Sequence, residues 1–312
     1  MKLFLTGAAG FIGMSYCERL ATTASHEVTA VDRREPAEKF GGISYHTLDL
    51  LDVTAVEKVV RELRPDAIVH LAAQARVDPS LVDPIPTFRD NVQATLNLIS
   101  AARVESASSP VLVYASSETV YGPAPSYPTG EGSQLNPQSP YAASKAASEL
   151  LVRSALPTRH LILRSGMGYG PRSDPRAQVI ARFIQIALRD GDLHFPPGVT
   201  KVTHPTRDVN YVSNFLDGLD LALASGVSGT FNIASGEEHS VLDLARLVIR
   251  VVGRGRIREN PEFQYRSGEV GLRTWLDISL ARKTFGYVPK INLEEGIRLT
   301  AEWMMSHPLR DG

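Results

Sequence analysis

Tyr141 and Lys145 stand four residues apart in a segment that predicts a helix opening after Ser139 and Pro140. This spacing places both side chains on one face of the helix, where the lysine ammonium can lower the pKa of the phenol. A phenol tuned in this way can take a proton from a sugar or alcohol hydroxyl, or return one, while a nicotinamide cofactor exchanges hydride. The pair therefore predicts acid–base chemistry at a hydroxyl group.

Ser117 completes the candidate catalytic set. It follows the apolar run at residues 111–115, which predicts a buried strand. Ligands of parallel sheets bind at the carboxyl ends of the strands, so the Ser117 hydroxyl is expected at such an end. We predict that Ser117, Tyr141 and Lys145 are the catalytic residues.

A glycine turn near the start of the chain predicts a dinucleotide site. Gly7, Gly10 and Gly13 follow the apolar run of residues 3–5 in the spacing G-x-x-G-x-x-G, and a helical pattern begins at Phe11. Such a turn lets backbone N–H groups approach a pyrophosphate, and the helix N-terminus adds partial positive charge. The strand before the turn and the helix after it make this reading specific.

Asp32 bears on which dinucleotide binds. It ends the second predicted strand, where its carboxylate can accept a hydrogen bond from the adenosine ribose and would repel a 2′-phosphate. NAD is therefore predicted as the cofactor. Arg33 and Arg34 follow directly and could hold a phosphate, so NADP stays as the alternative.

The composition narrows the classes of function. The chain has 312 residues, of which 43% are hydrophobic, and a formal net charge of -1, so we expect no nucleic-acid or membrane partner. Met1 leads straight into a strand with no apolar signal segment, which predicts a cytoplasmic protein. Cys17 is the single cysteine, and His194 and His204 stand alone, so no disulfide or metal site is expected.

Strand-like runs alternate with helical patterns over the first half of the chain. This alternation predicts right-handed crossovers and a doubly wound parallel α/β sheet covered on both faces. We expect an NAD-binding Rossmann domain at residues 1–165 and a smaller α/β substrate lobe at 166–312, interleaved with late elements of the main sheet. The expected strands are 3–5, 27–31, 43–47, 67–70, 110–115, 159–164, 193–195 and 229–233, and the expected helices are 11–22, 53–63, 88–105, 141–155, 176–190, 212–225, 241–252 and 293–305.

Taken together, these motifs resemble a known family, the extended short-chain dehydrogenase/reductases that act on nucleotide sugars. The resemblance runs in family order from residue 3 to residue 277 and so covers nearly the whole chain. The matching segments are Thr6–Gly13, Asp49-Leu50, His70–Ala73, Asn91-Val92, Ser116–Gly122, Ser139–Tyr141 with Lys145, Tyr169–Arg172, Arg207-Asp208 and Arg266–Glu269.

The resemblance implies roles for individual residues. Tyr141 would be the general base, Ser117 would hydrogen-bond the hydroxyl that is oxidised, and Lys145 would support the tyrosine. Asp49 and Leu50 would line the adenine. The expected cofactor-binding residues are Gly7, Gly10, Phe11, Ile12, Asp32, Asp49, Leu50, Leu71, Ala72, Ala73, Tyr141 and Lys145.

A nucleotide-sugar substrate carries phosphate charges, which the arginine fork can bind in two places. Arg207 and Arg266 are the candidates for this contact, and Phe195 could stack on the base or pack in the lobe. The expected substrate-binding residues are Arg76, Asn91, Ser117, Glu118, Met167, Phe195, Arg207 and Arg266.

Two departures from the family pattern concern the phosphate contacts. Relatives usually carry an asparagine three residues after the arginine of the sixth strand, whereas Met167 follows Arg164 here. Residues 196–205 replace a short glycine-rich turn, and Lys201 within them could compensate for the missing donor.

Glu118 and Thr119 bear on the reaction. In this family a 4,6-dehydratase usually has an Asp-Glu or Ser-Glu pair immediately before the Val-Tyr-Gly equivalent. Glu118 is displaced by one place from the position of that glutamate, which on a strand would turn it to the opposite face, although a loop could still aim it inward. We expect Glu118 to be exposed, or to lie behind the residues that touch the ligand.

Without an evident elimination pair, we predict an NAD-dependent nucleotide-sugar 4-epimerase that acts through a transient 4-keto intermediate. A 4,6-dehydratase, a decarboxylase and a 4-keto reductase of the same family are the alternatives, and a non-catalytic NAD-binding scaffold is the distant one. Apolar positions on the helices at 88–105 and 141–155 also predict a homodimer through a helix bundle.

Overall fold

The computed structural model describes residues 1–103, 110–198, 204–263, 265 and 271–307. The chain folds into two compact units. The first unit comprises Met1–Gly122, Gln134–Arg164 and Leu219–Phe231, and the second comprises Pro123–Ser133, Ser165–Gly218 and Asn232–Gly312.

A seven-stranded sheet is the centre of the first unit. Its strands are β1 (Lys2–Thr6), β2 (Glu27–Asp32), β3 (Ile43–Thr47), β4 (Ala67–His70), β5 (Val111–Ser117), β6 (His160–Ser165) and β11 (Gly229–Ile233). They follow the order β11-β6-β5-β4-β1-β2-β3, and β1 pairs in parallel with both β2 and β4. The chain order reverses between β1 and β4, and ligands of doubly wound sheets bind at the carboxyl ends beside such a reversal.

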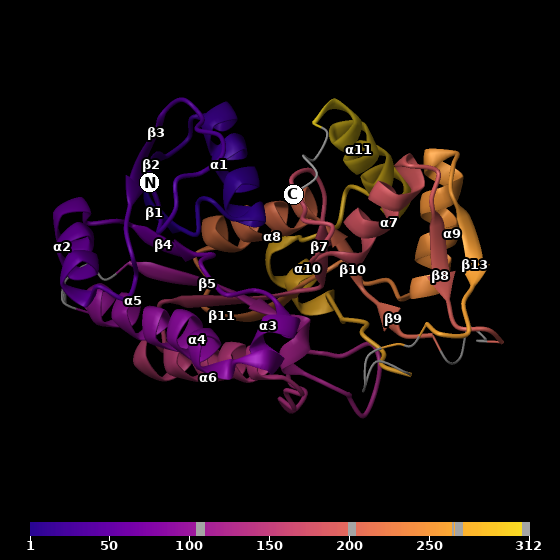
Figure 1. The fold of residues 1–312 in the computed structure, drawn as a ribbon. Coiled ribbons are helices and arrows are strands. Elements are labelled where there is room, and N and C mark those ends of the chain that lie inside the picture. The colour runs from indigo at the N-terminus through magenta and orange to yellow at the C-terminus, as the bar shows by residue number, and fades with distance from the viewer. Residues whose placement is uncertain (104–109, 199–203, 264, 266–270, 308–312) are drawn as a thin grey trace. The chain divides into compact units, whose positions relative to one another are not determined.

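Helices cover both faces of this sheet, which is why its central strands are continuous apolar runs. Leu3, Phe4 and Leu5 of β1 are completely buried. Figure 1 shows α1 along one face and α2, α5 and α6 along the other. The helices of the first unit are α1 (Phe11–Thr23), α2 (Val53–Leu63), α3 (Val77–Val82), α4 (Pro84–Phe88), the π-helical turn η1 (Arg89–Gln93), α5 (Ala94–Arg103), the 3-10 turn η2 (Glu118–Val120) and α6 (Pro140–Ala155).

The second unit has its own core between α7, α9 and α11, where Ile184, Leu244 and Ile297 are completely buried. Its strands form short pairs, with β7 parallel to β10, β8 parallel to β13 and β9 antiparallel to β12. Its elements are β7 (Met167–Tyr169), α7 (Val179–Leu188), β8 (Asp192–Phe195), β9 (Thr206–Arg207), β10 (Val209–Tyr211), β12 (His239–Ser240), α9 (Val241–Val252), β13 (Arg256–Glu259), α10 (Ser279–Phe285) and α11 (Leu293–Ser306), while α8 (Val212–Ser225) contributes residues to both units.

The doubly wound α/β prediction is confirmed. The single helix expected at 88–105 differs, because a π-helical turn at Arg89–Gln93 separates α4 from α5. The strand expected at 229–233 is β11, the edge strand of the main sheet, which agrees with the expected interleaving of the later segment with that sheet. Within the described residues, no helix has both the length and the apolar character needed to cross a bilayer.

Candidate active site

The glycine turn joins β1 to α1 with its backbone folded against β2. Gly7 and Ala8 both donate their backbone N–H groups to the carbonyl oxygen of Val31, at 2.9 and 3.1 Å. Gly7 has a φ of +82°, and a Cβ there would lie 2.6 Å from the backbone nitrogen of Ala72. At Gly13 a Cβ would lie 2.0 Å from the Gly7 carbonyl oxygen, so α1 can start this close to the turn only with glycine.

A cleft lies beside this turn, at the carboxyl ends of β1, β2 and β4. Its cavity volume is about 120 Å³, and its wall is formed by the turn, the strand ends and the residues that follow β4. The Asp32 carboxylate on its wall accepts hydrogen bonds from the backbone nitrogens of Ala9, at 3.1 Å, and Arg34, at 3.0 Å. A carboxylate has about four acceptor positions, so Asp32 keeps capacity for a ribose hydroxyl.

Most of the cofactor residues expected from the sequence share this cleft. Its wall includes the turn residues Gly7 and Gly10, the strand-end residue Asp32, the pair Asp49 and Leu50, and Leu71, Ala72 and Ala73 after β4. Phe11 and Ile12 lie instead in the first turn of α1, and Tyr141 and Lys145 lie on α6.

Arg33 also lines the cleft and is held by Asp90 of η1, with 2.9 Å between Nη1 and Oδ2. Arg89 approaches the other carboxylate oxygen of Asp90 at 3.0 Å. This pairing engages one of the two guanidinium groups named for a 2′-phosphate, and the other, that of Arg34, belongs to a residue that also lines the cleft.

The hydroxyl groups of Tyr141 and Ser117 lie close enough to interact, and the Ser117 hydroxyl lowers the pKa of Tyr141. Tyr141 lies in the first turn of α6, which begins with Ser139 as the N-cap and Pro140 at the first position, as the sequence indicates. The backbone N–H of Tyr141 donates to Ser80 Oγ at 3.2 Å. Ser117 ends β5, and its hydroxyl oxygen accepts from Thr119 Oγ1 at 3.0 Å.

Lys145 lies one turn further along α6 and is buried. Its Nζ donates to the carbonyl oxygen of Ala115 at 2.8 Å and lies over the Tyr114 ring, 4.8 Å from the centroid. Burial lowers the pKa of Lys145 to about 8, and the charge of Glu149 opposes that shift.

The pKa of Tyr141 is dominated by burial, so any lowering by Lys145 does not decide it in this structure. Burial raises the pKa of Tyr141 to about 12, the hydrogen bond with Ser117 lowers it, and the charge of Glu118 raises it. The Lys145 ammonium is bonded to a β5 carbonyl, so desolvation of the phenol dominates.

Asn91 connects the cleft to α6, which differs from the substrate contact expected for it. Its side chain is buried in the π-helical turn, where Nδ2 donates to Gln74 O at 3.1 Å and to Ser144 Oγ at 2.8 Å. Its Oδ1 accepts from Gln74 N at 2.7 Å. Gln74 lines the cleft, so Asn91 ties the cleft wall to the helix of Tyr141 instead of facing a ligand.

Glu118 corrects a second expectation. The strand β5 ends at Ser117, and Glu118 opens the 3-10 turn η2 with a side chain that is only 6% exposed. Its charge raises the pKa of Tyr141, so the carboxyl group lies near the phenol. The expectation of an exposed Glu118 is therefore wrong, because the strand alternation on which it rested stops one residue earlier.

The remaining expected substrate residues divide between the units. Arg76 is exposed at the start of α3 in the first unit. In the second unit, Met167 packs against the core and donates its backbone N–H to Asp208 O at 2.8 Å. Phe195 is buried among aromatic rings, 6.0 Å from Phe183 between centroids, which is the packing role rather than a free stacking face.

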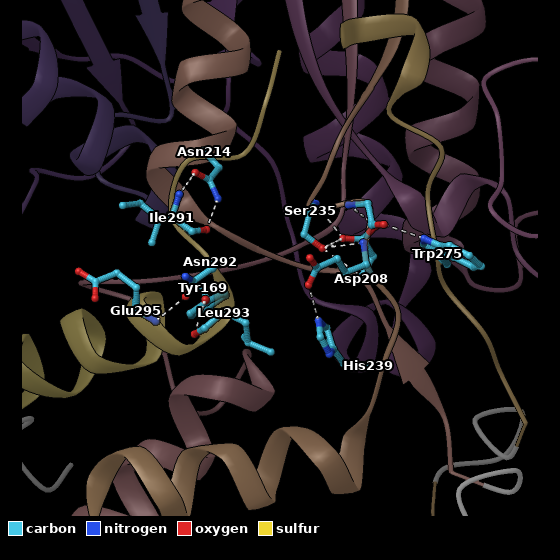
Figure 2. A network of polar contacts seen from close by, with 12 residues as sticks. Tyr169, Asp208, Asn214, Ser235, His239, Trp275, Ile291, Asn292, Leu293 and Glu295 are labelled. Atoms are coloured by element: carbon cyan, nitrogen blue, oxygen red, sulfur yellow. Dashed lines mark hydrogen bonds and ion pairs between the residues drawn. The ribbon is translucent and has the colours of Figure 1, made fainter.

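Arg207 lies beside a carboxylate that organises the second unit. Arg207 is 7% exposed, and its Nη1 donates to Thr206 O at 2.8 Å. The Asp208 carboxylate accepts from Ser235 N at 2.8 Å and Ser235 Oγ at 2.5 Å (Figure 2). It also accepts from Gly236 N and Leu276 N, both at 3.2 Å. Arg266 and Lys201, both named from the sequence, lie outside the described residues.

Sequence reasoning missed Thr119, Gln74 and Asp90 as parts of this arrangement. The spacing of Thr119 two residues after Ser117 is the signal that could have found the first, because hydroxyl side chains commonly bond two residues away in turns. Gln74 and Asp90 act through long-range contacts that no local pattern marks. Within the part of the chain that the structure describes, no group of three His, Cys, Asp or Glu residues could hold a metal ion.

The glycine turn, the strand-end carboxylate and the Ser–Tyr–Lys set on a doubly wound sheet define a dinucleotide-dependent short-chain dehydrogenase/reductase. More narrowly, the chain belongs to the GDP-mannose 4,6 dehydratase family, whose model matches residues 4–300.

Similar proteins carry out more than one reaction. The chain is 33% identical to a UDP-glucose 4-epimerase of Mycolicibacterium smegmatis, covering 97% of this chain and 98% of that protein. It is 31% identical to a dTDP-glucose 4,6-dehydratase of Streptomyces antibioticus, covering 97% and 92%. Its fold matches the crystal structure of Thermus thermophilus UDP-glucose 4-epimerase in complex with NAD with a TM-score of 0.85, at 31% identity over 98% of this chain and 99% of that one.

Proposed function

We propose that this protein is an NAD-dependent nucleotide-sugar 4-epimerase that acts through a transient 4-keto intermediate. The observation that carries the proposal is that the Ser117 hydroxyl acts on Tyr141, with Lys145 buried one turn further along α6, in the unit that holds the cleft. Similarity to the mycobacterial and Thermus 4-epimerases supports this reaction.

The residues present fit NAD, the cofactor of this family. A Cβ at Gly7 would clash with the backbone of Ala72, and a Cβ at Gly13 would clash with the carbonyl oxygen of Gly7, so the tight turn requires glycine at both positions. The Asp32 carboxylate can still accept a hydrogen bond from a ribose hydroxyl. Asp49, Leu50 and Ala73 would line the rest of the adenosine side. Bound NAD supplies the hydride acceptor, the donor that returns the hydride, and a positive ring charge that favours the tyrosinate.

Tyr141 would move the proton. As a tyrosinate, its Oη takes the proton of the C4 hydroxyl as the C4–H bond breaks, and it returns that proton when the keto group is reduced from the other face. Ser117 donates a hydrogen bond to the same oxygen and stabilises its developing charge. In the structure the pKa of Tyr141 is about 12, so the phenol is protonated near neutral pH until a neighbouring positive charge lowers that pKa.

The second unit, which covers most of residues 166–312, would bind the nucleotide sugar. Arg207 is the cation that we assign to the diphosphate, and Asp208 holds the neighbouring turns in place. Arg266 is assigned to the same role on its sequence motif alone.

A 4,6-dehydratase is the second candidate, and Glu118 is the observation that favours it. A buried carboxyl near Tyr141 could remove the C5 proton or protonate the departing C6 hydroxyl, which elimination requires. The similarity to the Streptomyces dTDP-glucose 4,6-dehydratase supports this alternative.

One incubation separates these reactions. The purified protein is mixed in D₂O with UDP-, dTDP-, GDP- and CDP-sugars carrying deuterium at C4, and the products are read by mass spectrometry and proton NMR. A 4-epimerase gives a product of unchanged mass that keeps the C4 label and takes no solvent deuterium. Loss of water with solvent deuterium at C5 would identify the dehydratase, loss of carbon dioxide a decarboxylase, and bound NAD without turnover a scaffold.

We also propose a homodimer that forms through the helices on one face of the first unit. Large apolar side chains are exposed there, among them Leu81, Val82 and Ile85, at 58%, 87% and 75%, together with Leu150 at 55%. They lie on α3, α4 and α6, which Figure 1 shows next to one another. Such a patch indicates a protein interface.

Light scattering tests the dimer. The wild-type protein should give twice 34.0 kDa, and the Ile85→Lys variant should give the monomer mass. A wild-type monomer would refute the dimer. The cytoplasmic location stays a prediction.

A further inference from the structure

A completely buried ion pair lies behind the catalytic residues and has no part in the proton transfer described above. Glu149 on α6 is 0% exposed, and Arg164 on β6 is 2% exposed. Arg164 binds the carboxylate in a fork, with Nη2 2.6 Å from Oε2 and Nε 3.0 Å from Oε1. Removing two charges from water is costly, and a pair of apolar side chains of similar volume is often as stable. The position of the pair therefore calls for a role other than stability.

The ion pair forms hydrogen bonds to the chain on both sides of Ser117. Glu149 Oε1 accepts from Ser116 Oγ at 2.5 Å, immediately before Ser117. Arg164 Nη1 donates to Tyr121 Oη at 2.8 Å, and the guanidinium lies over the Tyr121 ring, 4.7 Å from its centroid. Residues 117–120 thus run between two anchors that belong to one ion pair.

The same pair is tied to the other catalytic residues through α6. Tyr141, Lys145 and Glu149 follow one another at intervals of four residues and so share a face of the helix. The anchor at Ser116 consequently sets the distance between the end of β5 and the helix that carries the phenol. The Ser117–Tyr141 hydroxyl contact depends on that distance.

We propose that Glu149 and Arg164 are positioning residues that hold Ser117 against Tyr141 and keep Lys145 charged. The inference rests on the proposed epimerase chemistry, because it assigns the pair a role in that reaction.

The electrostatics agree with this role. The charge of Glu149 raises the pKa of Lys145 against the lowering by burial. Among the described residues, the other titratable groups that act on Lys145 or Tyr141 are His70 on β4, Tyr114 on β5 and Glu118 on η2. Glu149 is the group whose charge opposes the loss of the ammonium. Its removal should lower the pKa of Lys145.

The test compares two variants with a matched control. Glu149→Gln keeps the shape but leaves the buried Arg164 charge unpaired, so it could fail to fold. Glu149→Gln combined with Arg164→Met removes both charges and keeps the protein testable. Asp220→Asn is the control, because Asp220 joins an arginine and a tyrosine of the same unit away from the cleft, Arg19 at 3.1 Å and Tyr16 at 2.8 Å.

The readouts are kcat and KM across pH, and hydrogen exchange of the peptide covering residues 116–121. In the double variant we expect kcat to fall about tenfold or more with KM nearly unchanged, the alkaline limb of the kcat profile to move to lower pH, and exchange of that peptide to quicken. Asp220→Asn should leave all three at the wild-type values.

A folded double variant with wild-type kcat, pH profile and exchange would overturn the proposal. The exchange measurement does not need turnover, so it judges the positioning role by itself. Failure of the epimerase proposal is read separately, from the products of the wild-type enzyme.

Discussion

The two units hold their functional loops by different means. In the first unit the cofactor turn is shaped by backbone and small residues, because a Cβ at Gly7 or Gly13 would meet the main chain. In the second unit one carboxylate, Asp208, collects the N–H groups of Ser235, Gly236 and Leu276, which lie 27, 28 and 68 residues away along the chain. A turn whose backbone must pack this closely accepts few sequences, so it can be recognised in the sequence as a motif. Loops held by one side chain can vary in their other residues, which would suit the substrate binding that we propose for this unit.

The largest effect should come from the chemistry of the first unit. Tyr141→Phe removes the group that moves the proton, so kcat should fall by about 10³-fold while NAD content stays at the wild-type level. Tyr45→Phe on β3 is the matched control, because the Tyr45 hydroxyl accepts from Phe40 N at 3.2 Å and has no role in the proposed chemistry. Turnover of the Tyr141→Phe variant near the wild-type rate would remove Tyr141 from the mechanism.

The steric character of the glycine turn can be tested at Gly13. Gly13→Ala places a Cβ 2.0 Å from the Gly7 carbonyl oxygen and should lower the free energy of unfolding by about 3 kcal/mol and abolish NAD retention. Gly41→Ala is the control, since no atom lies within 4 Å of its Cβ position. Denaturant unfolding and the cofactor absorbance of the purified proteins measure both effects. Equal behaviour of the two variants would contradict the steric argument.

Asp208→Asn tests the other half of the comparison. The amide that replaces one carboxylate oxygen cannot accept from backbone N–H groups, so the turns at Ser235 and Leu276 lose acceptors. We expect KM for the nucleotide sugar to rise about tenfold, which is about 1.4 kcal/mol, with NAD content unchanged. Asp277→Asn, which affects a local bond from Ser279 N at 2.8 Å, should leave KM unchanged. An unchanged KM in both variants would separate Asp208 from substrate binding.

A gradual effect, spread over several pH units, concerns acid stability, to which His70 of the first unit should contribute. Burial lowers the pKa of His70 to about 3 from its ordinary 6.5, and its ring bonds Thr6 at 2.8 Å and Thr95 at 3.1 Å. Below pH 6.5 the unfolded chain binds a proton that the folded one does not, so this contribution is present above pH 6.5 and lost as the pH falls toward 3. Each pH unit should cost about 1.4 kcal/mol of the free energy of unfolding.

The contribution of His70 is measured as the difference in the free energy of unfolding between the wild type and a His70→Gln variant. Burial raises the pKa of Asp208 to about 6, which makes its contribution fall as the pH rises and so opposes that of His70. Unfolding curves of wild type and His70→Gln between pH 4 and 7, subtracted from each other, isolate the histidine. Parallel curves would show that His70 does not carry the dependence.

The sequence predicted the first unit well because its signals are local. The expected strand at 27–31 and helix at 53–63 agree with β2 and α2, and the capped start of α6 follows from Ser139 and Pro140. In the second unit β9 and β12 have two residues each and exist only through their pairing, so no periodicity marks them.

The residues of the candidate site could be predicted from the sequence, but their pKa values could not. The spacing of Tyr141 and Lys145 indicates a shared helix face, whereas the burial that raises one pKa and lowers the other depends on the packing of β4, β5 and α6. Strand alternation alone points Glu118 away from the site, but β5 ends at Ser117, so the loop alternative applies and Glu118 is buried in the next turn. Asn91 looked like a ligand contact because its partners, Gln74 and Ser144, are 17 and 53 residues away.

The amide of Asn91 couples two parts of the first unit that are far apart in the sequence. Its side chain joins Gln74, on the wall of the cleft, to Ser144 on α6, the helix that carries Tyr141. A substitution that removes this amide should therefore disturb the cleft wall and α6 together.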